Sequence, residues 1–257
     1  MDTNLETASP ADGVALERLL AGRHSCRGFL STPVPRALQT KILDMAQRTA
    51  SWCNSQPWRL HITEGAATER FRMALLSARS EDEKGPDFAW PGEYRGIYRQ
   101  RRLDCALQLY DSVGIVRGDR EASARQAREN FRLFGAPHVA IVTTDAALGV
   151  YGAVDCGGYV ANFLLAAGSL GVATIAQAAL ASRPGRVREF FGLDQPVYVQ
   201  YFHWVTNVLQ GDLGTSWTRG MPVSGMVGSA FMVTLEIGLV TLLVATVVGV
   251  PLGVISG

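Results

Sequence analysis

The sequence predicts an α+β fold for residues 1–194, followed by one transmembrane α-helix. Apolar residues recur at helical spacing along the first part, interrupted by only a few short β-branched runs. Charge is divided unevenly, because of the 24 basic and 23 acidic residues only Asp212, Arg219 and Glu236 lie beyond residue 194. The two parts are therefore different kinds of chain, and we expect a domain at 1–194 and a separate segment at 195–257.

The elements of the first part follow from apolar periodicity and from the placement of proline and glycine. Helices are expected at 14–20, 35–50, 67–79, 94–112, 120–134, 151–170 and 183–191. The β-branched runs predict strands at 58–63 and 137–143, and a shorter strand with a loop at 171–178. Residues 80–93 are charged and carry two glycines and two prolines, which predicts a loop.

The helix expected at 151–170 is almost wholly apolar, but its many small residues argue against a membrane span and favour a buried central helix. Asp155 and Asn162 are seven positions apart and share one face of it. A satisfied polar pair in a core or dimer contact is favoured over a catalytic acid.

A polar, turn-prone stretch at 51–57 ends at a proline and leads directly into the strand expected at 58–63. Asn54 and Gln56 carry paired donors and acceptors that can read the edge of a flat heterocycle, and Trp52 and Trp58 would wall it. The plainer alternative is a polar loop before a core strand. Upstream, Arg23 and Arg27 lie four positions apart in a loop, which suits a phosphate group.

Together, Arg-His-Ser-x-Arg-x-Phe at 23–29 and Ser-x-x-Asn-x-Gln-Pro-Trp at 51–58 resemble the two N-terminal signatures of the FMN-dependent nitroreductase family. Further blocks at 134–138 and 170–193 are similar to the same family, so that the resemblance extends over about residues 14–193. It implies a nitroreductase-like sandwich, a homodimer with two FMN molecules at its interface, and an NAD(P)H-dependent oxidoreductase that reduces nitroaromatics or quinones by hydride transfer.

The resemblance also implies which residues hold the cofactor. The phosphate and ribityl chain would be held by Arg23, His24, Ser25 and Arg27. The ring would be lined by Ser51, Cys53, Asn54 and Gln56, with the backbone of Ala176, Gln177 and Ala178 near its reactive nitrogen.

Few other side chains are candidates for chemistry. Hydride transfer through a flavin needs little acid or base catalysis, so no catalytic residue is named, and His61 and His138 are expected to be structural. The four cysteines lack a metal-ligand spacing, so no metal site is expected. The arginines of 94–112 are expected to form a solvated helix face and not a nucleic-acid site.

Residues 192–257 resemble the permease subunit of a dipeptide or oligopeptide ABC transporter. Ile237–Ile255 is free of charge and long enough to cross a bilayer, which predicts a transmembrane helix at about 232–256. Residues 1–13 contain no secretory signal, so the first part is expected in the cytoplasm, associated with the membrane through this helix.

The join between the two parts affects both expected activities. The nitroreductase part is expected to lack the family's C-terminal arm, which weakens FMN binding and the dimer, and the permease part is expected to lack the helices that transport requires. The alternative to an enzyme is therefore a non-functional chimera of a truncated nitroreductase and a permease fragment.

Overall fold

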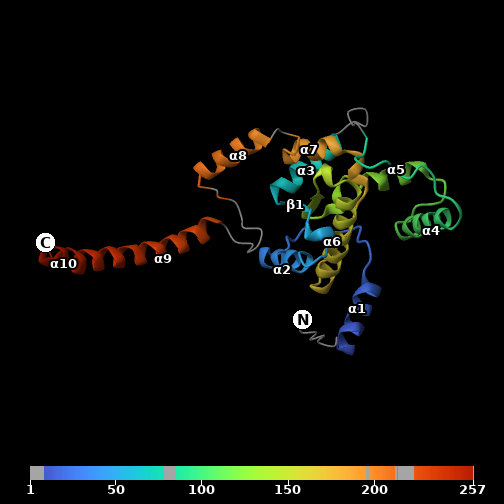
Figure 1. Cartoon of the computed structure of the whole chain (residues 1–257). Helices are drawn as coiled ribbons and strands as arrows, with labels where there is room; N and C mark the ends of the chain where they lie inside the picture. Colours follow the sequence, from blue (N-terminus) through green and yellow to red (C-terminus); the bar gives the residue numbers. More distant parts are fainter. Residues whose placement is uncertain (1–8, 78–84, 195–196, 212, 214–222, 257) are drawn as a thin grey trace. The chain divides into compact units, whose positions relative to one another are not determined.

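The computed structural model of the chain describes residues 9–77, 85–194, 197–211, 213 and 223–256. The chain forms two compact units, Met1–Asp194 and Gln195–Gly257 (Figure 1). The N-terminal unit contains α1 (Pro10–Gly22), α2 (Arg36–Ala46), β1 (Arg59–Glu64), α3 (Ala66–Ser77), α4 (Gly96–Ser112), α5 (Arg120–Arg128), β2 (His138–Thr143), α6 (Gly149–Ser169) and α7 (Pro184–Phe191). The C-terminal unit contains α8 (Val197–Leu209), α9 (Val223–Val244), a π-helical turn η6 (Ala245–Gly249) and α10 (Val250–Ser256).

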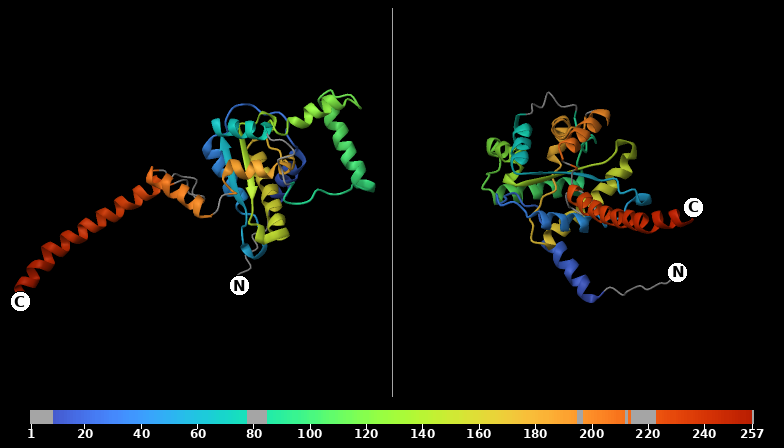
Figure 2. Two further views of the ribbon diagram at one scale, coloured as in Figure 1. Left: turned by 90° about the horizontal axis from the view of Figure 1, so that it is seen from above. Right: turned by 90° about the vertical axis from the view of Figure 1, so that its left-hand side faces the viewer.

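The two strands confirm the two longer β-branched runs of the sequence. They pair antiparallel, with Arg59 opposite Thr143 and Glu64 opposite His138. Side chains alternate between the two faces of a strand, so Leu60 and Val142 point to one face while His61 and Ile141 point to the other. The two-stranded sheet separates two apolar cores, and helices lie on both of its faces (Figures 1 and 2).

The core on one face of the sheet is built by α2 and α6. Trp58, Leu60, Ala46 and Tyr159 pack together, and the rings of Trp58 and Tyr159 stack with centroids 4.9 Å apart. A continuation of this core joins Ile42 of α2 to Ala166 and Ala167 of α6. The small residues of α6 let α2 approach it closely, as the predicted central helix requires.

The core on the other face is built by α3 and α7. Phe71 and Leu75 are fully buried against Leu133 and Leu180. The rings of Phe190 and Phe191 lie 4.8 and 5.2 Å from that of Phe71. Aromatic contacts of this kind add about 0.5–1.5 kcal/mol each to the apolar burial.

Several helices of the N-terminal unit are poorly buried in the single chain. Neither α1, α4 nor α5 contributes a buried residue. On α1 the predicted apolar side is largely exposed, with Val14 at 67 % and Leu20 at 54 %. On α6, Val150, Tyr151 and Val154 are each more than 60 % exposed, so this helix is only partly buried.

Two expectations for the N-terminal unit are wrong. The described residues 171–178 contain no strand, because the two-stranded sheet does not extend to them. The helix expected at 120–134 ends at Arg128, since Leu133 and Phe134 take positive φ values of 59° and 50° and turn into the core. The loop expected at 80–93 lies partly outside the described residues.

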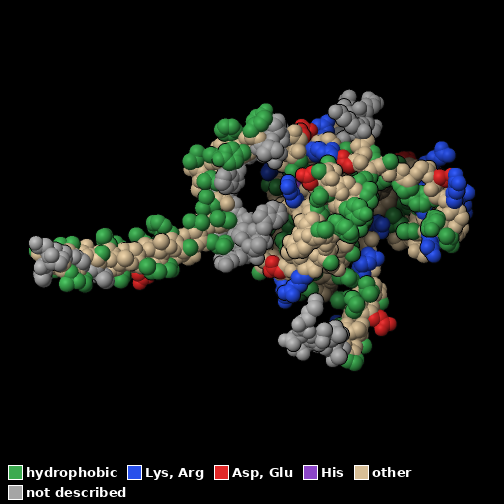
Figure 3. Space-filling model, in the orientation of Figure 1, with side chains coloured by type: hydrophobic (Ala, Val, Ile, Leu, Met, Phe, Trp, Pro, Cys, Tyr) green, Lys and Arg blue, Asp and Glu red, His purple; other side chains and the backbone are tan. Residues whose placement is uncertain are grey.

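The C-terminal unit is dominated by one apolar helix that begins at Val223, nine residues before the predicted start. Hydrophobic side chains lie along the whole of its visible face in Figure 3, and Glu236 is its one acidic residue in the sequence. Pro251 lacks an N–H, so the turn before it widens to the π form and the helix continues. Among the residues that the structure describes, two helices are long and apolar enough to cross a membrane, this one and α6 with its preceding turn, by length and composition alone.

Candidate functional site

The first predicted segment, residues 23–28, is held against two distant parts of the chain. The main-chain N–H of Cys26 donates to the carbonyl of Thr174 at 3.1 Å, and that of Phe29 donates to Phe134 at 3.3 Å. The first bond brings the Arg-His-Ser-x-Arg loop beside Thr174, two residues before the third predicted segment, 176–178. Two of the three segments that the sequence analysis selected therefore lie close together in one chain.

The side chains of this loop point into solvent. Arg23, His24, Ser25 and Arg27 are all exposed. Neither Arg23 nor Arg27 forms an ion pair within the described part of the chain. The Nδ1 of His24 donates to the carbonyl of Gly22 at 2.9 Å, and its Nε2 lies 3.5 Å from the thiol of Cys26. The loop thus presents two uncompensated guanidinium groups, which favours an anionic ligand.

The second segment, residues 51–56, has an unusual backbone. Cys53, Asn54 and Gln56 have positive φ values of 49°, 53° and 45°, although none of them is glycine. Each such residue costs about 1–3 kcal/mol and persists only where its surroundings enforce it. The enforcing contacts are visible: the N–H of Gln56 donates to the hydroxyl of Ser51 at 2.9 Å, and the N–H of Trp52 donates to the carboxylate of Asp155.

A chain of side-chain hydrogen bonds runs along the same loop. The indole N–H of Trp58 donates to Gln47 Oε1, Gln47 Nε2 donates to Gln56 Oε1, and Gln56 Nε2 donates to Asn54 Oδ1, each at 2.9 Å. The sequence analysis did not select Gln47. It lies just after α2, and no local pattern connects it to the loop nine residues later.

Asp155 and Asn162 are satisfied polar groups, as expected, but they do not pair with each other. Asp155 accepts from Trp52, and Asn162 Nδ2 donates to the hydroxyl of Thr49 at 2.8 Å. These hydrogen bonds from the polar face of α6 hold segment 49–52 in place and so position the loop at 51–56.

The two tryptophans of the motif differ in position. Trp58 is only 7 % exposed and stacks on Tyr159, so the expectation that it walls a ligand is wrong. Trp52 is 65 % exposed, with its ring 5.5 Å from that of Tyr151. Trp52 alone of the pair remains accessible to a ligand.

The third segment contains a buried polar atom. The amide Nε2 of Gln177 is buried and has no hydrogen-bond partner among the described residues, while Ala176 and Ala178 are exposed. Leaving such a donor unpaired costs about 1–3 kcal/mol. A buried donor without a partner beside the arginine loop is a group that a ligand can satisfy.

Two histidines are structural, as the sequence predicts. His138 accepts from the N–H of Val34 at 2.9 Å through Nε2 and donates to the carbonyl of Thr63 at 3.1 Å through Nδ1. His61 lies between Thr143 and the ring of Phe191. Burial, and to a lesser extent the charge of Arg59, lowers the pKa of His61. Burial likewise raises the pKa of the Cys156 thiol, which makes it a poor nucleophile.

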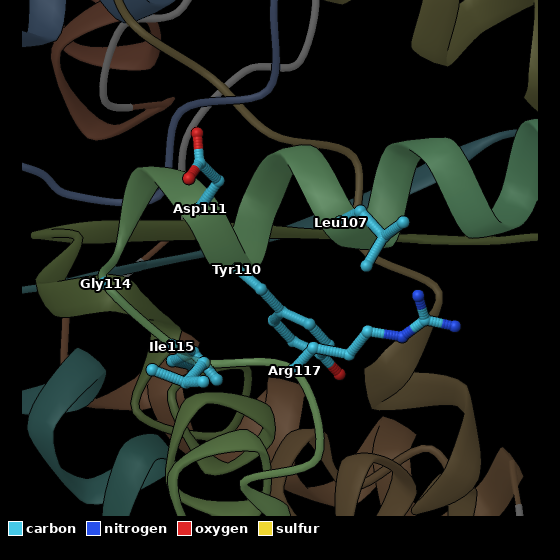
Figure 4. Close-up of a pocket in the computed structure, with 7 residues that line it drawn as sticks. Leu107, Tyr110, Asp111, Gly114, Ile115 and Arg117 are labelled. Carbon is cyan, nitrogen blue, oxygen red and sulfur yellow. The ribbon is translucent and has the colours of Figure 1, made fainter.

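A hollow of about 450 Å³ lies at the end of α4, away from all three segments. It is lined by Leu107, Tyr110, Asp111, Gly114, Ile115, Val116 and Arg117. Figure 4 shows Tyr110 and Arg117 on one side of the helix and Asp111 on the other. Because it contains none of the predicted site residues, we do not assign it to the site.

The site consists of three segments of one α+β unit: the loop at 23–28, the strained loop at 51–56 and the segment around Gln177. The sequence of the chain matches the model of the nitroreductase family over residues 20–204. The chain belongs to the nitroreductase family. That match covers most of the N-terminal unit and continues into α8. It confirms the resemblance that the two motifs indicated.

Named nitroreductases agree with this assignment. The chain is 32 % identical over 185 residues to nitroreductase NfnB of Mycolicibacterium smegmatis, an alignment that covers 70 % of this chain and 77 % of that protein. The crystal structure of the FMN-dependent NfnB from Mycobacterium smegmatis in complex with NADPH superposes with a TM-score of 0.66 over 70 % of this chain and 82 % of that one. A 4-nitrobenzoate reductase of Pseudomonas putida is 30 % identical over 178 residues, covering 69 % of this chain and 78 % of that protein.

The C-terminal part has a different relative. It is 44 % identical over 70 residues to the probable D,D-dipeptide transport system permease protein DdpB of Escherichia coli. The alignment covers 27 % of this chain and 21 % of that permease. A nitroreductase domain is therefore continuous with a stretch that is similar to a fifth of a permease.

Proposed function

We propose that this nitroreductase is an FMN-dependent NAD(P)H oxidoreductase that reduces nitroaromatics or quinones by hydride transfer. One observation carries the proposal: the family's ring-lining motif at 51–56 is held in a left-handed backbone conformation by Ser51 and Asp155. A strained loop with that much support is typical of a binding site. The named relatives act on nitroaromatic compounds or are FMN-dependent, as their names state.

The residues present fit FMN. Arg23 and Arg27 are exposed cations without carboxylate partners in the described part of the chain, and Ser25 adds a hydroxyl beside them, which suits a phosphate monoester. Ser51, Cys53, Asn54 and Gln56 offer donors and acceptors for the ring. Gln177, between Ala176 and Ala178, supplies a buried donor that lacks a partner among the described residues. His24 lies in the same loop, where its ring nitrogens contact the carbonyl of Gly22 and the thiol of Cys26.

FMN, when bound, supplies a ring that takes a hydride from NAD(P)H and delivers it to the acceptor. The chain's own residues then have two tasks. The arginine loop would hold the anionic end of the cofactor, and the strained loop would orient its ring. No side chain is assigned a proton-transfer step, which agrees with the structural contacts of His61 and His138.

We further propose that the site is completed by a second copy of the chain. Within the described residues, no hydrogen bond joins loop 51–56 to loop 23–28 or to segment 174–178. Val150, Tyr151 and Val154 expose an apolar face on α6 next to Trp52, and α1 exposes another. A homodimer buries both faces, although the loss of the family's C-terminal arm is expected to weaken it.

The apolar helix Val223–Ser256 supports membrane association, and we propose that the nitroreductase domain lies on the cytoplasmic side. The helix carries one charged residue, Glu236, and its apolar window is not buried within the described structure. The similarity to DdpB favours a second candidate, a chimera in which neither the reductase nor the transporter is functional. The chain matches only 21 % of that permease, so we do not propose transport.

A flavin absorbance spectrum of the detergent-purified full chain separates the two candidates. The enzyme is expected to bind FMN, and the bound FMN is expected to bleach when NADPH is added. The variant Arg23→Ala should lose most of the bound FMN, since a charge-assisted contact contributes about 1.5–3 kcal/mol, equivalent to roughly tenfold to a hundredfold in affinity. The matched control is Arg18→Ala, which removes an exposed arginine of α1. A chain that binds no flavin, or that binds it equally well in both variants, would contradict the assignment.

A further inference from the structure

The hydrogen bonds that join Trp58, Gln47, Gln56 and Asn54 have a fixed direction. An indole N–H can only donate, so the oxygen of Gln47 must face Trp58. The amide nitrogen of Gln47 then faces Gln56, which in turn places the Gln56 oxygen toward Gln47 and its nitrogen toward Asn54. Each amide in the chain is therefore oriented by the one before it.

Trp58, the first donor in this series of hydrogen bonds, is held rigidly. Trp58 is 7 % exposed, and its ring stacks on that of Tyr159 with centroids 4.9 Å apart. The end of the series is held as well, because Asn54 and Gln56 have left-handed backbone conformations that the Ser51 and Asp155 contacts maintain. Gln47, Gln56 and Asn54 are exposed between these two anchors.

We infer that Trp58, acting through Gln47 and Gln56, sets the hydrogen-bond polarity that Asn54 presents to a ligand. The oxygen of Asn54 accepts from Gln56, so its free amide N–H groups face outward. The loop then selects a heterocycle whose facing edge carries acceptors, such as carbonyl oxygens. Gln47 is a positioning residue in this scheme, and the inference rests on the proposed function for the identity of that heterocycle as a flavin.

The substitution Gln47→Glu reverses the series with almost no change in shape. A carboxylate still accepts from Trp58, but its second oxygen would face the oxygen of Gln56 and repel it. Gln56 is therefore expected to turn its nitrogen toward residue 47 and its oxygen toward Asn54. Asn54 then turns its nitrogen inward and presents its oxygen to the ligand. The variant thus presents the Asn54 oxygen to a ligand acceptor where the wild type presents an N–H donor. Because two acceptors then face each other, we expect the affinity for FMN to fall about tenfold.

Two comparisons separate this effect from simpler ones. Riboflavin lacks the phosphate, so reversed polarity weakens FMN and riboflavin by the same factor, whereas repulsion between the new charge and the phosphate weakens FMN alone. Gln47→Leu removes both bonds without imposing the reversed direction, and a loss of about threefold is expected. Gln108→Glu adds the same charge at an exposed position of α4 and should leave both affinities unchanged.

The measurements are fluorescence titrations of the full chain with FMN and with riboflavin, together with hydrogen exchange of the Asn54 side-chain amide, followed by NMR without ligand. The inference requires faster exchange in the wild type than in Gln47→Glu, in which that amide is hydrogen-bonded. The inference is overturned if the exchange rate is the same in the wild type and in Gln47→Glu. It is also overturned if the affinity falls for FMN but not for riboflavin, or if Gln47→Leu and Gln47→Glu lower the affinity equally. If the wild type binds neither flavin, the proposed function fails while the exchange measurement still decides the direction of the series.

Discussion

The main-chain N–H of Trp52 donates to both carboxylate oxygens of Asp155, at 3.3 and 3.1 Å, across 103 residues of sequence. This contact joins α6 to the start of the strained loop. The three left-handed residues 53, 54 and 56 follow within four positions, so the contact supports a backbone conformation that the loop would not keep by itself.

Replacing Asp155 with alanine should loosen the loop and weaken FMN binding. A hydrogen bond to a charged acceptor contributes about 1.5–3 kcal/mol, and because Trp52 is 65 % exposed we expect the lower end, equivalent to about a tenfold loss of affinity. Asp155→Asn keeps a neutral acceptor and should lose less. Flavin titration measures both, with Asp111→Ala on α4 as a control for the removal of an exposed carboxylate. Equal affinities in Asp155→Ala and in the control would mean that the contact does not shape the site.

Gln177 offers a test in which stability and binding change in opposite directions. Its buried Nε2 has no partner in the described structure, so Gln177→Leu removes an unsatisfied donor and should leave the melting temperature of the FMN-free chain unchanged or raise it. If FMN satisfies that donor, the same variant should bind FMN about tenfold more weakly. Thermal unfolding with and without FMN measures both effects. A variant that loses stability without FMN but keeps its affinity would assign Gln177 to the protein's packing alone.

The two strands and both motif loops could be predicted from the sequence because their signals are local. A β-branched run after Pro57 or Pro137 specifies a strand wherever the chain packs, and the motif spacings need no knowledge of tertiary contacts. The end of α5 could not be predicted in this way. Phe131 and Phe134 continue its helical spacing, yet Phe134 is buried in a left-handed turn that only the packing of the second core explains.

The site shows the same limit. Arg23, Asn54 and Gln56 belong to motifs, whereas Gln47 and Asp155 act through contacts with residues that the sequence does not connect to them. Trp58 was expected at the ligand because it lies in the motif, but directly before β1 it is buried against Tyr159. A local sequence pattern does not show that a helix far along the chain will bury a side chain.

The stability of the N-terminal unit should decrease in mildly acidic solution because of His61. Burial and the charge of Arg59 lower its folded-state pKa below the usual value of about 6.5, so the unfolded chain binds a proton more readily than the folded chain. Stability from this group is therefore complete above about pH 6.5 and is lost as the pH falls through the lowered folded pKa. Chemical denaturation between about pH 8 and pH 5 should show a smaller decline in His61→Phe than in the wild type. Arg59→Gln removes the second cause and should reduce the decline only slightly. An unchanged pH profile in His61→Phe would exclude this histidine as the source.

The C-terminal helix should anchor the chain in membranes, and a charge placed within its predicted span should prevent this. An arginine near the centre of a span costs about 2.5–3.5 kcal/mol on insertion, and the cost decreases toward the ends. Val247 lies within the uncharged stretch and is 62 % exposed, whereas Val227 lies before Glu236 and is 52 % exposed. We therefore expect Val247→Arg to lose most of its alkali-resistant membrane association, while Val227→Arg, which adds the same side chain to the same helix, retains it. The measurement is the amount of full-length protein in alkali-washed membranes, with a chain ending at Asp194 as the unanchored reference. If both variants remained in the membrane pellet equally, or if the wild type fractionated like the shortened chain, the helix would not cross the bilayer and the proposed membrane association would fail.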